Sequence, residues 1–278
     1  MLRNYKCVKI KMHFQLVSDL HLEYNHDKDV YEDPMQYIKP SASYLILAGD
    51  VGSLYLYSAL RAALERICSH FKAVLYVAGN HEYYIQKSND ERLLIDDLSA
   101  RLHTLSDIKG LYVLDRDSAI VGDICFVGCT LWSKPYMCIP KYIVRIHGIS
   151  DTLYETLHRN DLNYISNMMD YCRRENLRMV VVTHYSPSFK TIENCKSRSK
   201  RPTLYATDLH KYIKHPIEMW CHGHTHNNMD INVGGIPVIS NQRGKTSEKI
   251  NSYLNDRIVT IPKKISHNKA CIQPVISK

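Results

Sequence analysis

The sequence has no apolar run that approaches the roughly 18 residues of a membrane-spanning helix. We therefore expect no membrane span. The first eleven residues also lack the unbroken apolar stretch of a signal peptide, because lysine and arginine side chains interrupt them. Together these absences predict an intracellular protein, and the cytoplasm is the compartment we expect.

The sequence also lacks a CxxC pair, and its nine cysteines are odd in number and scattered along the chain. Scattered cysteines in an intracellular protein are usually reduced thiols of the core. We expect neither a disulfide framework nor a zinc site built from thiolates.

The composition is that of a globular protein. The chain has 278 residues, 45% of them hydrophobic and 23% charged, which excludes disorder as the main state. One α/β domain of this size is ordinary. The composition does not predict an oligomeric state.

Positive charge is unevenly placed in a chain whose net charge is +8. Basic residues gather in the first eleven residues, in a loop at residues 190–201 and in the tail after Gly244. Such clusters favour anionic partners, which include phosphorylated substrates and nucleic acid. Solubilising charge on exposed segments is the alternative interpretation.

In one stretch, residues 73–82, an apolar run is followed directly by polar residues. The apolar run Ala73–Val77 predicts a strand covered on both faces, as in a parallel sheet. Gly79 then permits a sharp turn into Asn80, His81 and Glu82. The carboxyl ends of parallel strands are where ligands bind in open α/β sheets.

The rest of the chain predicts an α/β half followed by an antiparallel half. Helical spacing predicts an amphipathic helix over residues 54–70 and a second helix from a cap at residues 88–91 to about Leu105. A capping box that starts at Thr152 predicts a third helix to about Cys172. Turn residues predict hairpins at residues 119–128 and 229–240.

Polar residues follow five of the predicted strands, so we expect them at the same edge of one sheet. Any one of them could be a cap or a turn residue, but five such strand ends in one chain are not explained in that way. Carboxylates mixed with imidazoles, without sulfur, favour Mn²⁺, Fe or Zn²⁺, and seven donors with one shared carboxylate suit two ions. The polar residues at these strand ends are Asp19, His21, Asp50, Asn80, His81, His184, His224 and His226.

The same stretches resemble the five motifs of the calcineurin-like metallophosphoesterase superfamily, in order, and small single-domain members most closely. The resemblance covers roughly residues 12–244. The motifs are Asp19-Leu20-His21, Gly49-Asp50, Gly79-Asn80-His81-Glu82, Thr183-His184 and Gly223-His224-Thr225-His226.

The resemblance implies a fold and a domain organisation. The fold is α/β of the α+β type, a four-layer αββα sandwich in which two mixed β-sheets are flanked by helices. The domain would span residues 12–244, with an N-terminal extension at residues 1–11 and a basic C-terminal extension at residues 245–278, outside the core.

The resemblance also implies a site and a reaction. Asp19, His21 and His226 would hold one divalent ion, Asn80, His184 and His224 a second, and Asp50 would bridge them. A metal-bound hydroxide would then attack a phosphomonoester or phosphodiester. His81 would act with Asp50 in catalysis, either as the general acid or by stabilising the transferring phosphoryl group. Weaker candidates for substrate binding or support are Glu82, His222 and Arg243.

The motifs leave the substrate open. Asp50 is followed by Val51 and Gly52 instead of the Asp-Arg-Gly typical of protein Ser/Thr phosphatases, which argues against that branch. Cyclic-nucleotide phosphodiesterases, dinucleotide hydrolases and lipid-linked pyrophosphatases all share the motifs, so a nucleotide-type substrate is one expectation. The alternatives are a nuclease that uses the same site and an inactive scaffold protein of the same fold.

Overall fold

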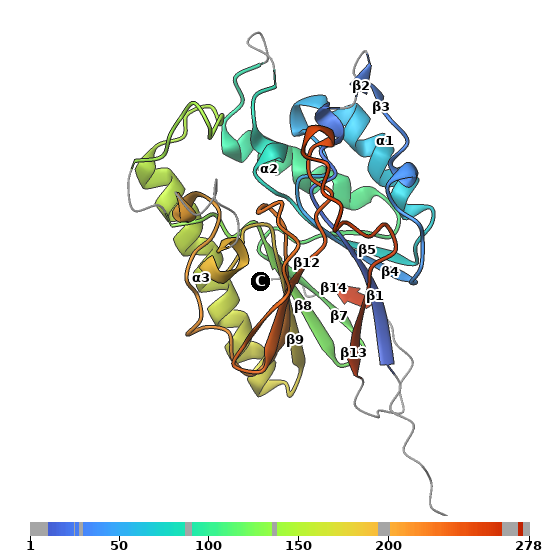
Figure 1. Cartoon of the computed structure of the whole chain (residues 1–278), viewed down its shortest axis with the longest axis vertical. Helices are drawn as coiled ribbons and strands as arrows, with labels where there is room; N and C mark the ends of the chain where they lie inside the picture. Colours follow the sequence, from blue (N-terminus) through green and yellow to red (C-terminus); the bar gives the residue numbers. More distant parts are fainter. Residues whose placement is uncertain are drawn as a thin grey trace, which may run out of the picture.

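The computed structural model describes residues 11–24, 26–27, 30–86, 91–134, 138–193, 201–262 and 272–274. It has four layers, shown in Figure 1: two packed β-sheets with helices on both outer sides. Helices α1 (Tyr57–Cys68) and α2 (Ile95–Thr104) cover one sheet, and α3 (Asp151–Arg174) covers the other. The expected αββα sandwich of two mixed sheets is confirmed.

The first sheet contains five strands, and its centre is parallel. β1 (Lys11–Val17), β4 (Tyr44–Ala48), β5 (Ala73–Val77) and β6 (Leu111–Val113) run parallel, and β13 (Ile258–Pro262) pairs antiparallel with β1. Every residue of β4 and β5 is buried. Because both faces of these strands are covered, their sequences are continuous apolar runs without alternation.

The second sheet contains seven strands and is also mixed. Its order is β11 (Ile231–Val233), β12 (Ile236–Ser240), β10 (Ile217–His222), β9 (Arg178–Thr183), β8 (Ile124–Cys129), β7 (Asp117–Val121) and β14 (Ile272–Pro274). The two predicted hairpins, β7–β8 and β11–β12, are confirmed. The expectation of an antiparallel second half is wrong for the central strands, since β8, β9, β10 and β12 pair in parallel. The long helix α3 provides the crossover that a parallel β8–β9 pair requires.

Three apolar layers hold the sandwich together. Phe14, Phe126 and Val180 belong to the layer between the two sheets. Leu60 and Leu98 pack with Tyr76 between the first sheet and helices α1 and α2, while Ile165 and Met169 of α3 pack with Trp220 against the second sheet. Each predicted amphipathic helix therefore buries its apolar face against a sheet.

Helix α2 begins later than its sequence signal predicts, and helix α3 begins earlier. Residues 88–90 of the expected α2 cap lie outside the described residues, and Glu91–Leu94 are not helical. The Asp97 carboxylate accepts the N–H of Leu94 at 3.0 Å, which fixes the start at Ile95. For α3 the cap is Ser150, whose hydroxyl accepts the N–H of Leu153 at 3.1 Å, and not Thr152.

The expectation that the C-terminal extension lies outside the core is wrong. β13 extends the first sheet, and its residues Val259 and Ile261 are buried between the sheets. Tyr253 also packs against the core. The apolar residues of β13 alternate over only a few positions, which is too short a signal to reveal an edge strand. The ends of the domain remain a proposal.

At the other end, residues 1–10 of the expected N-terminal extension lie outside the described residues, and Lys11 begins β1.

None of the helices in the described ranges combines the length and the apolar character that a membrane crossing needs. Short elements complete the structure: the β2 (His26–Asp27) and β3 (Val30–Tyr31) pair, and 3-10 turns at Leu22–Tyr24, Pro34–Gln36, Leu54–Leu56, His81–Tyr83, Leu105–Asp107, Phe189–Ile192, Pro202–Leu204 and Thr246–Glu248.

Candidate metal centre

The polar residues that follow the strands meet at one end of the sandwich. β1, β4 and β5 of the first sheet and β9 and β10 of the second all end there. The expectation that these residues share the edge of one sheet is therefore wrong, because two sheets contribute. The packing of the sheets places their carboxyl ends side by side, and the site lies across both.

The backbone turns sharply at the candidate ligands. Asp19, His21, Asp50, His224 and His226 all have φ between 45° and 67°, in the left-handed region that non-glycine residues rarely adopt. Each such conformation costs on the order of 1 kcal/mol or more, and such residues cluster at functional sites. Five of the candidate metal ligands therefore have a strained backbone conformation.

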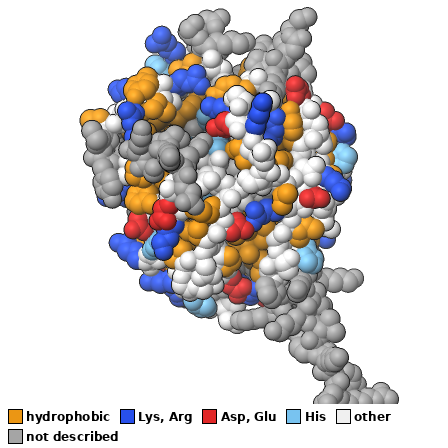
Figure 2. Space-filling view, in the orientation of Figure 1, with side chains coloured by type: hydrophobic (Ala, Val, Ile, Leu, Met, Phe, Trp, Pro, Cys, Tyr) orange, Lys and Arg blue, Asp and Glu red, His pale blue; other side chains and the backbone are white. Residues whose placement is uncertain are grey.

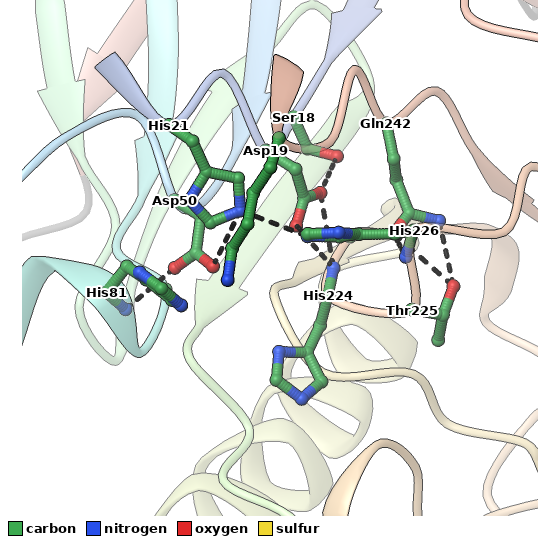
Figure 3. A network of polar contacts seen from close by, with 12 residues as sticks. Ser18, Asp19, His21, Asp50, His81, His224, Thr225, His226 and Gln242 are labelled. Atoms are coloured by element: carbon green, nitrogen blue, oxygen red, sulfur yellow. Dashed lines mark hydrogen bonds and ion pairs between the residues drawn. The ribbon is translucent and has the colours of Figure 1, made fainter. Parts of the chain in front are cut away.

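Asp50 lies between two groups of donors. Its Oδ2 is 3.7 Å from Nε2 of His21 on one side and 3.3 Å from Nε2 of His184 on the other. Its Oδ1 accepts the N–H of His81 at 2.8 Å, which fixes the carboxylate in place (Figure 3). One carboxylate is thus shared by two potential ion sites.

The first group consists of Asp19, His21, Asp50 and His226. Nε2 of His21 lies 3.0 Å from Nε2 of His226, and the latter atom lies 3.2 Å from Oδ1 of Asp19. One ligand atom from each of the four residues lies within 4.8 Å of the others. Figure 3 shows these side chains grouped together although they come from loops far apart in the sequence.

The second group is centred on Nε2 of His184. This atom is 3.0 Å from Oδ1 of Asn80 and 3.2 Å from Nδ1 of His224. Asp50, His184 and His224 again place one ligand atom each within 4.8 Å of one another. The structure therefore brings together all seven residues that the sequence resemblance assigns to the two ions.

The outward nitrogen of each imidazole in these groups has an acceptor. Nδ1 of His184 donates to the carbonyl oxygen of Ala48 at 2.9 Å, and Nε2 of His224 donates to that of Leu204 at 3.0 Å. Nδ1 of His21 faces Glu23 at 2.9 Å. Because the outward nitrogen donates, the inward nitrogen of the neutral ring is the one that would present its lone pair to a metal ion.

The electrostatics are those of a tightly coupled ionic cluster. Burial acts to raise the pKa of Asp19, but the His226 imidazole outweighs it and the pKa falls to about 2. Burial acts to lower the pKa of His184, but the Asp50 carboxylate outweighs it and raises the pKa to about 9. Burial, helped by His184, lowers the pKa of His224 well below its ordinary value. The carboxylates thus favour positive charge at the centre.

These donors fit divalent ions. Two nitrogen–nitrogen pairs, His21–His226 and His184–His224, approach to 3.0 and 3.2 Å with carboxylate or amide oxygens beside them. Convergent imidazole nitrogens and hard oxygens, with no sulfur in either group, suit Mn²⁺, Fe or Zn²⁺.

Glu82 supports the turns that carry Asp50 and Asn80. Its buried carboxylate accepts the N–H groups of Gly79, Asp50 and Val51 at 2.8, 3.1 and 2.8 Å, and the hydroxyl of Tyr76 at 2.8 Å. Burial and the Asp50 carboxylate together raise the pKa of Glu82 to about 8. Glu82 touches the backbone of the site and not the cavity above it.

Gly79 is required by space as well as by the turn. A Cβ added there would lie 2.2 Å from Oδ1 of Asp50, the atom that accepts from His81. At Gly223 a Cβ would lie 2.6 Å from Oδ2 of Asp19. The glycines of the motifs therefore allow the backbone to approach the candidate ligands.

The other two weaker candidates, His222 and Arg243, belong to neither group of donors. His222 is buried, its Nε2 has no hydrogen-bond partner among the described residues, and burial lowers its pKa to about 4. Arg243 donates to the carbonyl oxygen of Leu20 at 2.7 Å and lies over the Tyr37 ring at 3.6 Å. Arg243 thus holds the loop between Asp19 and His21, which leaves phosphate binding by this residue a prediction without structural support.

Three supporting residues escaped the sequence interpretation. Oε1 of Glu23 lies 2.9 Å from Nδ1 of His21 and 3.0 Å from Nδ1 of His81, which explains why these residues also form a close cluster. Gln242 accepts the N–H of His226, and Glu248 faces Nδ1 of the same residue at 2.5 Å. Glu23 stands two residues after His21, the last residue of the first motif, which is a usable signal, whereas Glu248 has none.

A cavity of about 340 Å³ opens above the donors. Asp50, Asn80, His81, His224 and His226 contribute to its floor and walls. The lining also includes tyrosine side chains, two basic side chains, three aliphatic side chains and the carboxylate of Glu248. The arrangement can receive a small anionic group directly over the candidate metal ligands.

Comparisons with known proteins agree with this geometry. A family model described as calcineurin-like phosphoesterase matches residues 12–228. An uncharacterized protein of Acanthamoeba polyphaga mimivirus is 27% identical over 265 residues, which cover 84% of this chain and 92% of that protein. The crystal structure of the phosphopantetheinyl hydrolase PptH from Mycobacterium tuberculosis is similar with a TM-score of 0.71 at 15% identity, over 91% of this chain and 97% of that one.

Proposed function

The chain belongs to the calcineurin-like phosphoesterase family, and we propose that it is a hydrolase that cleaves phosphomonoester or phosphodiester bonds with two divalent ions. The observation that carries this proposal is the position of Asp50, whose Oδ2 faces His21 on one side and His184 on the other. A carboxylate shared between two donor groups is what a pair of ions needs to stay together.

Asp19, His21 and His226 would hold one ion, and Asn80, His184 and His224 the other. When bound, the ions supply an activated water and neutralise charge on the phosphoryl oxygens. The protein contributes the orientation of these ligands, through Glu23, Glu82, Glu248 and the carbonyl oxygens described above. The choice among Mn²⁺, Fe and Zn²⁺ is part of the proposal, with Mn²⁺ as the first ion to test.

His81 is the proposed proton donor to the leaving oxygen. Its imidazole lines the cavity, and its Nδ1 lies 3.0 Å from Glu23. The backbone N–H of His81 donates to Oδ1 of Asp50, which ties the residue to the shared carboxylate. Burial lowers the pKa of His81 against the opposing effect of Asp50, so the protonated ring is a stronger acid while a smaller fraction of the protein carries it at neutral pH. Stabilisation of the transferring phosphoryl group is the alternative role.

The experiment that tests the proposal is an assay of the purified protein with Mn²⁺ on bis(4-nitrophenyl) phosphate and on 4-nitrophenyl phosphate. We expect hydrolysis that EDTA abolishes and added Mn²⁺ restores. Asp19→Asn should lose the activity, while Asp256→Asn, which changes an exposed carboxylate paired with Lys39, should retain it and so exclude a contaminating phosphatase. No hydrolysis of either ester with any of the three metals would favour the scaffold alternative.

A nuclease at the same site is a related candidate, supported by the basic loop. Lys196, Arg198 and Lys200 of that loop lie outside the described residues, and Arg201 donates to the hydroxyl of Tyr142. On the face shown in Figure 2, basic side chains are interspersed with acidic and hydrophobic ones and form no continuous basic surface. We therefore rank a small phosphoester ahead of a long nucleic acid, and an intracellular location remains part of the proposal.

A further inference from the structure

Two cations line the catalytic cavity in addition to the candidate metal ligands. The cavity includes Arg145, which is exposed, and Lys245, which is half-buried. Within the described ranges of the chain, neither side chain forms an ion pair with a carboxylate. Other arginines of the molecule are paired, such as Arg116 with Asp161 and Arg257 with Asp230. Arg145 and Lys245 are therefore available to an anion that enters the cavity.

Each of the two cations lies next to a tyrosine that neighbours His81. The His81 ring is 4.8 Å from the ring of Tyr84 and 5.8 Å from that of Tyr24, measured between centroids. The guanidinium of Arg145 lies 5.8 Å from the Tyr84 ring, and the ammonium of Lys245 lies 4.9 Å from the Tyr24 ring. A phosphoryl group beside His81 would thus have a cation beyond each neighbouring tyrosine.

The backbone that carries each cation is fixed to the site. The carbonyl oxygen of Arg145 accepts the N–H of Ile85 at 2.9 Å, one residue after Tyr84, and both neighbours of Arg145 in the chain are buried. The N–H of Lys245 donates at 2.8 Å to Glu248, the residue that faces His226. The backbone at both positions is therefore held by residues next to the proposed catalytic groups, and the cationic ends extend from these fixed points.

We propose that Arg145 and Lys245 bind phosphate groups other than the one that is cleaved, so that the substrate carries at least two phosphates. This inference rests on the proposed phosphoesterase function. Two ions suffice to neutralise the phosphoryl group under attack, and two further cations would add repulsion to the cavity unless further anions accompany it. A nucleotide chain and a nucleoside polyphosphate share this chemistry.

The test uses two chromogenic diesters that differ by one remote phosphate: thymidine 5′-(4-nitrophenyl phosphate) and its 3′-phosphorylated form. Both release 4-nitrophenolate from the same linkage. We expect wild-type kcat/KM to be higher for the 3′-phosphorylated form, through a lower KM, and the advantage to shrink as ionic strength rises. Arg145→Ala and Lys245→Ala should each reduce the ratio of the two kcat/KM values about three- to tenfold.

Charge-retaining and matched control variants separate binding from general electrostatics. Arg145→Lys and Lys245→Arg should recover part of the ratio. Lys141→Ala, on the same loop as Arg145, and Lys109→Ala each remove one exposed positive charge without touching the cavity, so they should leave the ratio unchanged.

The source of the second phosphate is distinguished by competitors. Thymidine 3′,5′-bisphosphate presents a spaced phosphate, and thymidine 5′-diphosphate presents a contiguous one. Tighter binding of the first than of thymidine 5′-monophosphate supports a nucleotide chain, and tighter binding of the second supports a polyphosphate.

Equal affinity for all three competitors, together with equal kcat/KM for the two diesters, would overturn the inference and leave the proposed function intact. A ratio that exceeds one but is unchanged in both alanine variants would also overturn it. If neither diester is hydrolysed, the proposed function itself has failed.

Discussion

The carboxylate of Glu248 lies 2.5 Å from Nδ1 of His226, a residue 22 positions earlier in the chain. Burial acts to lower the pKa of His226, but Asp19 and Glu248 outweigh it and raise the pKa to about 9. Glu248 thus fixes the ring so that Nε2 points to Asp19 and His21. The segment after Gly244, expected outside the domain, contributes directly to the orientation of a candidate ligand.

Replacing Glu248 by Gln should therefore weaken metal binding. Loss of a carboxylate that orients a ligating histidine typically costs about 10–100-fold in metal affinity or activity. Mn²⁺ titration of the apoprotein by calorimetry measures the effect. Asp256→Asn, in the same C-terminal segment, is the matched control. Equal Mn²⁺ affinity in Glu248→Gln and wild type would show that Glu248 has no positioning role.

Removal of the His81 imidazole should slow hydrolysis without removing the metals. For His81→Ala we expect a loss of about 10²–10⁴-fold with alkoxide leaving groups, because a general acid is needed most when the leaving group is poor. The loss should be small with nitrophenolate, which leaves without protonation. Rates on a methyl and a nitrophenyl ester of the same phosphate make the comparison, with metal content checked in parallel. Equal losses on the two esters would assign His81 to charge stabilisation instead.

Glu82→Gln should destabilise the fold. The carboxylate accepts three backbone N–H groups and one hydroxyl, and an amide in its place directs an NH₂ group at donors. We expect a loss of about 2–3 kcal/mol in the free energy of unfolding, since a buried group that accepts four hydrogen bonds is replaced by one that brings donors of its own. Urea unfolding of the metal-free protein measures it. Glu91→Gln, an exposed pair with Arg101, should change stability little, and a Glu82→Gln variant as stable as wild type would contradict the role.

Asp161 lies outside the metal centre, and its carboxyl should make the free energy of unfolding depend on pH. This buried carboxyl lies 3.0 Å from Arg116, yet burial raises its pKa from 3.8 to about 6. The folded protein therefore holds this proton more tightly than the unfolded chain. The resulting stabilisation is complete below pH 3.8 and is lost as the pH rises through about 6, by roughly 3 kcal/mol.

Urea unfolding of Asp161→Asn across this window tests the effect. The variant should show a smaller fall in stability between pH 3.8 and about 6 than wild type does. Asp170→Asn, at an exposed position of the same helix, is the control. If Asp161→Asn and wild type lose stability in parallel, the carboxyl of Asp161 is ionised throughout.

The strands that carry the site were predictable because burial on both faces forces continuous apolar runs. The strand predicted at Ala73–Val77 matches β5 in both of its ends. Each run ends in a change from apolar to polar residues, and this change identified the candidate ligands. Local signals of this kind do not depend on the rest of the fold.

Relationships between distant segments were not predictable. Whether Asp19 and His224 meet across one sheet or two depends on the packing of the sandwich, which no local pattern encodes. The short strand β13 is positioned by β1, more than 200 residues earlier in the chain, as in the contact of Thr260 with His13. Glu248 is positioned by His226, more than 20 residues earlier. The start of α2 likewise follows from the burial of Ile95 and Leu98, which overrides the earlier cap signal.

The central claim is that two ions share the carboxylate of Asp50, and metal analysis of Asp50→Asn tests it most directly. Wild-type protein reconstituted with Mn²⁺ and freed of excess metal should contain two ions per chain by elemental analysis. The Asp50→Asn variant should lose occupancy at both sites together with hydrolysis of bis(4-nitrophenyl) phosphate, while circular dichroism shows the fold retained. Two ions bound per chain in the folded variant, or fewer than two in wild type under saturating Mn²⁺, would contradict the account.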